Sequence, residues 1–322
     1  MERVCVLGAC GRPGLACTTE LLRSAKIQKI ICPVPSPCFK REMKHLEELK
    51  RLHSEKIQLE NLDTDSLNQE YIKNLLDTTN TTSVVIVFNY NHYLSDDINP
   101  DDASTEEYEA VAEIISAVKD LADIKTVVFS SLLNVDNPDF SMVPQFVSKR
   151  NQEERLKSTL TGNKHLRIVR FGYFFDNFMR PNFIGRSGII NSPLHKDTIV
   201  SGISTQDAGR ILASVTLNPQ TFGQTIDCVA DTFTIGQLAH HLGLDVDDSQ
   251  VERTRQNLPQ AVRKMYEQFD QGFFVGQSSV VIPFTLHSFE HWISDSMKNL
   301  KTQFKGKVHL GGEVVATGIS TQ

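Results

Sequence analysis

The sequence has no long hydrophobic run. Its apolar stretches all fall short of the about 20 residues that a membrane-spanning helix requires. The Met-Glu-Arg start leads into only a short apolar run, which is not the pattern of a signal peptide. We therefore expect no membrane partner and a cytoplasmic location, with the nucleus as the alternative.

Positive charge is scarce. The chain has 33 Lys and Arg against 39 Asp and Glu, a net charge of −6. Even the most basic stretch, residues 39–56, mixes six Lys or Arg with four Glu, as a solvated helix face does. Binding to nucleic-acid backbones requires clustered cations, so the composition predicts no direct nucleic-acid partner.

Cysteine motifs are also missing. None of the six cysteines forms a CxxC pair, and no histidine lies beside them at metal-ligand spacing, so we expect no metal site and reduced thiols. The sequence has no GxSxG, HExxH or P-loop motif either. Cys10 is the exception among the thiols. It lies near an expected helix N-terminus that would stabilise a thiolate, so a redox role stays open there.

Short apolar segments alternate with helical patterns through the first half of the chain. The expected strands are Val4–Leu7, Lys29–Cys32, Ile57–Leu59, Val84–Phe88, Thr126–Ser130 and Leu166–Phe171. The expected helices are Leu15–Ala25, Lys40–His53, Ser66–Leu76, Thr105–Ala122 and Pro144–Leu160. Nearly all-apolar strands that are each followed by a helix predict an α/β fold with a Rossmann-type, doubly wound parallel sheet.

The regular alternation weakens after Phe171. We expect an extended region at 181–203, a helix at 205–217, a strand at 225–229 and a helix that Thr234 caps. The predicted organisation is an NAD(P)-binding Rossmann domain at 1–171, whose sheet later segments complete. A smaller C-terminal α/β lobe follows at 172–304 with interleaved sheet elements, for a substrate or partner, and then a Gly-rich tail at 305–322.

The stretch LGACGRPG, residues 7–14, follows the first expected strand and precedes the first expected helix. In this context Gly8 permits a tight turn, Gly11 lets the backbone approach a pyrophosphate, and Gly14 lets the helix pack on the strand. The helix N-terminus favours negative charge. The loop therefore predicts that the protein binds a dinucleotide.

The end of the second expected strand indicates which dinucleotide. An NAD site places an acidic side chain there to bind the ribose 2′-hydroxyl, but residues 32–41 contain none. Ser36, Lys40 and Arg41, with Arg12 from the glycine loop, can instead meet a 2′-phosphate. We therefore expect NADP(H) to be preferred over NAD(H).

Five segments together resemble the NmrA-like atypical short-chain dehydrogenases, a family with nitrogen-metabolite-repression regulators and redox-sensing NADP-binding proteins. They are GACGRPG at 8–14, VSK at 147–149 on the helix after Ser130-Ser131, VRFGYFFDNF at 169–178, ISTQDAGR at 203–210, and HSFEHWI at 287–293. They span nearly the whole chain, and their order and spacing match the family.

The resemblance implies a role for each matching residue. Gly8, Gly11, Arg12, Pro13 and Gly14 would surround the pyrophosphate, with Cys10 in the same loop. Asn61 and Leu62 would lie along the adenine, and Asn89 and Tyr90 at the cofactor ribose. Lys149 would bind the nicotinamide ribose, with Ser130 nearby at a strand end. The segment Phe171 to Phe175, which includes Phe174, would pass beside the nicotinamide.

The chain departs from the family at the catalytic position. Active short-chain dehydrogenases carry Tyr-x-x-x-Lys, but Gln145 stands four residues before Lys149, and a carboxamide is no general acid.

The favoured interpretation is an NADP(H)-binding redox or metabolic sensor that acts through a regulatory protein partner. The second is an active NAD(P)H-dependent reductase of a small carbonyl, quinone or imine, with Lys149, Tyr173 or Tyr90 supplying the proton and Ser131 orienting the substrate. The third is a Rossmann scaffold that no longer binds a nucleotide.

Overall fold

The structure is a computed structural model that describes residues 1–35, 40–62, 68–88, 100–162, 164–179 and 189–304. Within these ranges it has one large sheet and two small ones. Ser36, Asn89, Tyr90 and the tail at 305–322, which the sequence analysis singled out, lie outside the described residues.

The large sheet has seven parallel strands in the order β10-β6-β5-β4-β1-β2-β3. Its strands are β1 (Glu2–Leu7), β2 (Ile27–Pro35), β3 (Ile57–Leu62), β4 (Ser83–Ile86), β5 (Thr126–Leu132), β6 (His165–Phe171) and β10 (Thr225–Cys228). The strand order reverses between β1 and β4, and ligands of open α/β sheets bind at such a switch point. The parallel strands and the reversal of their order confirm the predicted doubly wound α/β fold.

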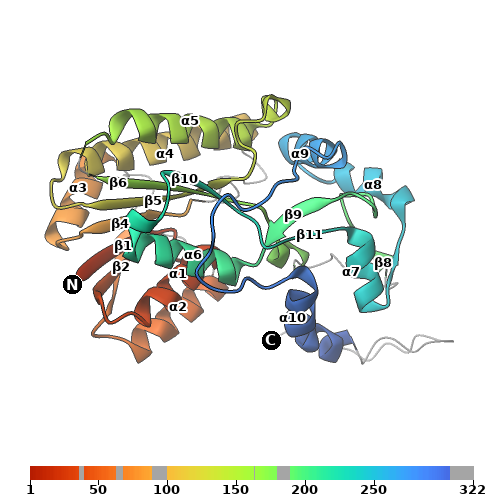
Figure 1. Ribbon diagram of the computed structural model, residues 1–322, viewed down its shortest axis with the longest axis horizontal. Coiled ribbons are helices and arrows are strands. Elements are labelled where there is room, and N and C mark those ends of the chain that lie inside the picture. The colour runs from red at the N-terminus through yellow and green to blue at the C-terminus, as the bar shows by residue number, and fades with distance from the viewer. Residues whose placement is uncertain (36–39, 63–67, 89–99, 163, 180–188, 305–322) are drawn as a thin grey trace.

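Helices cover both faces of this sheet (Figure 1). One face packs against α1 (Arg12–Leu22), α2 (Lys40–Leu52) and α6 (Thr205–Leu217), and the other against α3 (Gln69–Thr78), α4 (Pro100–Asp120) and α5 (Pro144–Thr159). Side chains alternate between the faces, so Val4 and Val6 of β1 join the first core while Cys5 and Leu7 join the second. The central strands β4 and β5 are therefore buried on both faces along almost their whole length.

Except for α6 and β10, which belong to the large sheet and its covering helices, the elements after β6 form a second group beside the sheet, at the right in Figure 1. Its strands are β7 (Tyr173–Phe174), β8 (Ile189–Ile190), β9 (Val200–Ile203), β11 (Asp231–Phe233) and β12 (Asp245–Val246). Its helices are α7 (Ile235–Leu242), α8 (Val251–Gln256), α9 (Gln260–Asp270) and α10 (Phe289–Phe304), with a 3-10 helix at Phe175–Met179. An aromatic-rich core that includes Phe175, Phe233, Phe269 and Trp292 holds this group together.

The expected elements agree with the structure except at their ends. The fourth strand ends at Ile86 and not at Phe88, and the third helix spans 69–78 and not 66–76. The helix at 205–217 has the expected bounds, and Thr234 caps α7 with a reciprocal capping box. The helices α8 and α9 and the short strands β7, β8, β11 and β12 were not predicted. Strands of two or three residues carry no periodic pattern.

Candidate functional site

The glycine loop lies between β1 and α1, at the switch point of the sheet. Gly8 has a φ of 93°, and a Cβ added there would lie 2.2 Å from the carbonyl oxygen of Val87. A Cβ added at Gly14 would lie 2.2 Å from the carbonyl oxygen of Gly8. Only glycine fits either position, because the loop passes so close to β4 and to α1.

Gly11 is different. Its φ is −73°, and a Cβ added there would meet only the Gly8 carbonyl oxygen, at 3.4 Å. Packing therefore permits a side chain at Gly11, so the glycine keeps space in front of the loop open. Gly11 is also the N-cap of α1, and no side chain caps that helix end. An uncapped helix end beside open space suits the pyrophosphate of a dinucleotide.

Arg12 begins α1 with an exposed side chain. Its Nη1 donates to the backbone carbonyl of Asp176, 2.6 Å away in the 3-10 helix Phe175–Met179. The Asp176 carboxylate in turn accepts a bond from the backbone N–H of Thr205, at the start of α6. Arg12 thus links the glycine loop to the segment after β7. The structure places Pro13 beside it in the first turn of α1.

The residues expected near the adenosine are only partly described. Asn61 is exposed, and its carbonyl accepts a hydrogen bond from the Tyr71 hydroxyl. Leu62 is buried in the core between the sheet and α3 to α5, so it has little surface for a ligand. Lys40 and Arg41 start α2, the helix that follows β2.

The aromatic residues after β6 differ in exposure. Phe171 is buried in the core on the α1 and α6 face, and Phe175 is buried in the aromatic core of the second group. Phe174 is only half-buried, and its ring centre lies 6.0 Å from that of Phe171. Tyr173 is also half-buried, with its hydroxyl 3.3 Å from that of Tyr266. Of these residues, Phe174 and Tyr173 have surface left for a ligand.

The two serines at the end of β5 face opposite sides of the sheet, because side chains alternate along a strand. Ser131 shares a face with Phe129, and the ammonium of Lys149 lies 5.1 Å from the centre of the Phe129 ring. Ser131 is buried, and among the described residues its Oγ has no hydrogen-bond partner. Ser131 is therefore on the side of Lys149, and Ser130 is on the other side.

Lys149 is buried in an ion pair. Its Nζ lies 2.9 Å from Oε1 of Glu107 on α4, a carboxylate with no exposed surface. Two more acceptors, the Phe88 carbonyl and Gln152 Oε1, each lie 3.3 Å from the same ammonium. The other Glu107 oxygen accepts bonds from Ser148 Oγ at 3.0 Å and Gln152 Nε2 at 3.2 Å. The charge of Lys149 is thus neutralised inside the protein, between α4, α5 and β4.

Gln145 lies one helical turn before Lys149 on α5 and is also buried. Its side-chain nitrogen contacts the sulfur of Met265 on α9. The position of the catalytic tyrosine in the family is therefore occupied by a carboxamide packed against the second group of elements.

Glu107 was not identified from the sequence. It lies 42 positions before Lys149 in an ordinary amphipathic helix, and nothing in its local sequence marks it. The pairing becomes visible only once α4 packs against α5.

The described cysteines are free thiols, and most lie deep in the core. Cys10 is nearly buried, and its Sγ lies 3.9 Å from the sulfur of Met43. Burial raises the pKa of Cys32 to about 12 and that of Cys228 to about 12. Burial also raises the pKa of Cys5 well above its usual value. These thiols stay protonated in the folded protein.

These raised pKa values predict a loss of stability at high pH. The thiols ionise near pH 8.5 in the unfolded chain but not in the folded one, so a rise in pH favours unfolding. The free energy of unfolding should fall above about pH 9 by up to about 1.4 kcal/mol per pH unit for each such thiol. Urea unfolding of the wild type and Cys32→Ala across this range measures the slope. The variant should have the shallower slope, and equal slopes would contradict the assignment.

No helix in the described part of the chain is both long and apolar enough to cross a membrane. Within the same residues, no group of three His, Cys, Asp or Glu side chains is placed to hold a metal ion.

Several solved structures share the fold of this chain. An NADPH-dependent quinone oxidoreductase from Escherichia coli matches with a TM-score of 0.66 and 15% identity, over 91% of this chain and 99% of that chain. The triphenylmethane reductase of Citrobacter sp., complexed with NADP(H), matches with a TM-score of 0.62 and 14% identity, over 91% and 99%. NmrA, a negative transcriptional regulator, matches with a TM-score of 0.58 and 16% identity, over 84% and 82%.

No protein-family model matches the chain, and no curated protein matches it in sequence. At these identities the structural likeness establishes the fold. The fold agrees with the NmrA-like resemblance in the sequence, since NmrA and the reductases share it.

Proposed function

We propose that the protein binds NADP(H) at the glycine loop and acts as a redox or metabolic sensor with little or no dehydrogenase activity. The observation that carries the binding is the glycine cradle: Gly8 and Gly14 have no room for a side chain, whereas the space in front of Gly11 is open. Gly8, Gly11, Arg12, Pro13 and Gly14 would hold the pyrophosphate. Bound there, the nicotinamide would supply a transferable hydride.

Two features of α5 support the absence of turnover. Gln145 cannot donate a proton at neutral pH, and its side chain packs on Met265. The ammonium of Lys149 is already paired with the buried Glu107, so it is not free to lower the pKa of a neighbouring acid. Position 145 of α5 thus carries no proton donor, and the lysine that would activate a donor there is held in another interaction.

The alternative function is an active NADPH-dependent reductase. Two observations support it. The chain shares its fold with reductases of quinones and triphenylmethane dyes. The buried hydroxyl of Ser131 has no hydrogen-bond partner among the described residues, so it could bind a substrate. Tyr173, half-buried after β6, would then be the proton donor.

NADPH should bind more tightly than NADH, by at least about tenfold. The reason is that residues 32–41 of the sequence include Ser36, Lys40 and Arg41, which can meet a 2′-phosphate, and no acidic residue that would repel it. Calorimetric titration with NADPH, NADP, NADH and NAD measures the ratio of the affinities for the phosphorylated and unphosphorylated dinucleotides. Lys40→Met should reduce it, whereas Lys29→Met, earlier on β2, should leave it unchanged. Equal affinities for NADPH and NADH would refute the preference.

Turnover should be absent or slow. A missing general acid costs about two to four orders of magnitude in rate. NADPH oxidation with a panel of quinones, aldehydes and imines, followed by absorbance, tests this expectation. The variant Tyr173→Phe tests the alternative function. If the wild type turns over NADPH at enzyme-like rates and this variant does not, the protein is a reductase and the sensor proposal is refuted.

A further inference from the structure

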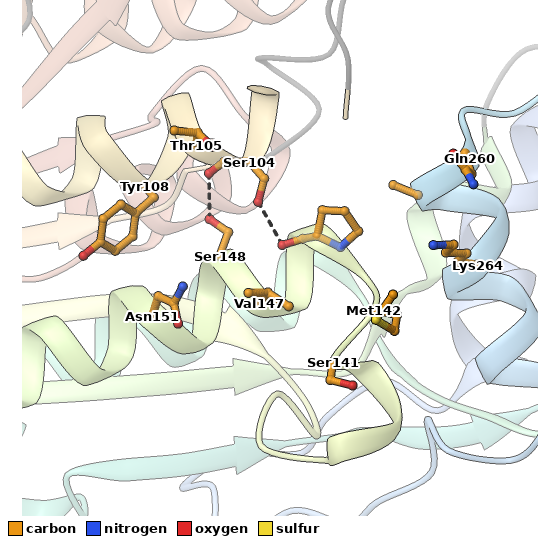
Figure 2. A pocket seen from close by; sticks show the side chains of 12 residues that line it. Ser104, Thr105, Tyr108, Ser141, Met142, Val147, Ser148, Asn151, Gln260 and Lys264 are labelled. Atoms are coloured by element: carbon orange, nitrogen blue, oxygen red, sulfur yellow. Dashed lines mark hydrogen bonds between the residues drawn. The ribbon is translucent and has the colours of Figure 1, made fainter. Parts of the chain in front are cut away.

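A cavity of about 480 Å³ lies between α4, α5 and α9 (Figure 2). Its volume falls in the range of about 300–1,000 Å³ that small-molecule sites occupy. The α5 residues that line it are Pro144, Val147, Ser148 and Asn151, and neither Gln145 nor Lys149 is among them. The cavity therefore lies on a different side of α5 from the proposed cofactor site.

The lining is rich in hydrogen-bond donors and has one cation. Hydroxyl and carboxamide side chains line the cavity together with Lys264, and no Asp or Glu is among the lining residues. Figure 2 shows Lys264 and Gln260 on the side of α9 that faces α5. Within the described part of the chain, neither side chain makes a hydrogen bond or an ion pair with another residue. Both are therefore available to a ligand.

The remaining lining is apolar. Met142, which is 69% exposed, lies between α5 and α9 in Figure 2. Val147 of α5 and Ala261 of α9 also line the cavity. A ligand that fits this lining has an anionic group for Lys264 and a small apolar body. An organic carboxylate or phosphate ester has that form.

The cavity is also connected to the cofactor side of α5. Ser148, which lines the cavity, donates from Oγ to the Glu107 carboxylate that pairs with Lys149. On α9, Lys264 lines the cavity while the next residue, Met265, contacts Gln145. A ligand that moves α5 or α9 would therefore change the surroundings of both Lys149 and Gln145.

We propose that this cavity binds a small organic anion and that its occupancy changes the affinity of the protein for NADP(H). The effect on NADP(H) affinity rests on the proposed function, whereas the binding of the anion does not. By thermodynamic linkage, bound NADP(H) must then change the affinity for the anion by the same factor.

Calorimetry with benzoate tests the binding part, since benzoate has one carboxylate on a small apolar ring. Benzamide, of the same shape but neutral, is the control ligand. Lys264→Met removes a cation and Gln260→Glu adds an anion. Each variant should weaken benzoate binding by about tenfold or more. Lys73→Met on α3 and Gln271→Glu beyond the end of α9 make the same changes away from the cavity and should have no effect.

The coupling part is tested by NADPH titration with and without saturating benzoate. The dissociation constant should change by about fivefold or more, and Ser148→Ala should reduce the change. Absent or non-saturable benzoate binding, equal binding of benzamide, or binding that Lys264→Met leaves intact would overturn the site. Benzoate binding that leaves NADPH affinity unchanged would overturn the regulatory part. Absent NADPH binding with benzoate binding intact would refute the proposed function and its regulation, while the anion site would stand.

Discussion

Replacing Gly11 with aspartate should abolish NADPH binding and leave the protein folded. Gly11 is the N-cap of α1 with a φ of −73°, a conformation that aspartate adopts readily, and its side chain would cap the helix. The added carboxylate would fill the space in front of the loop and repel the pyrophosphate. Because an added Cβ meets only the Gly8 carbonyl, at 3.4 Å, the loss of binding would not come from a collapsed loop.

Two further variants complete this test. Gly223→Asp adds the same charge away from the loop, at a position where an added Cβ makes only ordinary van der Waals contacts, so NADPH affinity should not change. Gly14→Ala should lower the melting temperature, because its Cβ would lie 2.2 Å from the Gly8 carbonyl oxygen. Calorimetry measures the affinity and thermal unfolding the stability. Wild-type NADPH affinity in folded Gly11→Asp would refute the pyrophosphate site.

Replacing Lys149 with methionine should destabilise the protein by about 3–5 kcal/mol, because it leaves the buried Glu107 carboxylate without its counter-ion. In the dehydrogenase pattern, this lysine would instead contact the cofactor, and its loss would affect binding more than stability. Urea unfolding in the absence of cofactor separates the two roles.

The double variant Lys149→Met with Glu107→Leu should recover much of the lost stability, since an apolar pair can replace a buried ion pair at little cost. Lys157→Met is the control on the same helix. Its partner Glu153 also binds Arg170, and Lys157 itself is 36% exposed, so the loss should stay below about 1 kcal/mol. A comparably small loss for Lys149→Met would show that the buried ion pair is not formed.

The sheet and its covering helices could be predicted from the sequence because their signals are local. The apolar run at 4–7 followed by Gly8 and Gly14 determines a strand, a turn and a helix within twenty residues. Thr234 with Gln237 likewise forms a capping box that the sequence indicates in four residues. The doubly wound form of the sheet followed from the right-handedness of parallel crossovers.

The partners of the site residues could not be predicted, because they come from distant parts of the chain. Arg12 was expected at a phosphate, but its bond to the Asp176 carbonyl joins residues 164 positions apart. Lys149 was expected at the cofactor ribose, but its ion pair depends on how α4 packs on α5. The resemblance to the dehydrogenases, with its Tyr-x-x-x-Lys spacing, indicated that Gln145 replaces a catalytic tyrosine, whereas the contact of Gln145 with Met265 required the fold.

The fluorescence of NADPH, followed over time in the presence of the protein and then of an added quinone, tests the central claim most directly. If the protein binds NADPH without turning it over, the emission of bound NADPH should appear on mixing and persist after the quinone is added. Absence of the bound-state emission would contradict binding, and its decay at an enzyme-like rate would contradict the sensor role.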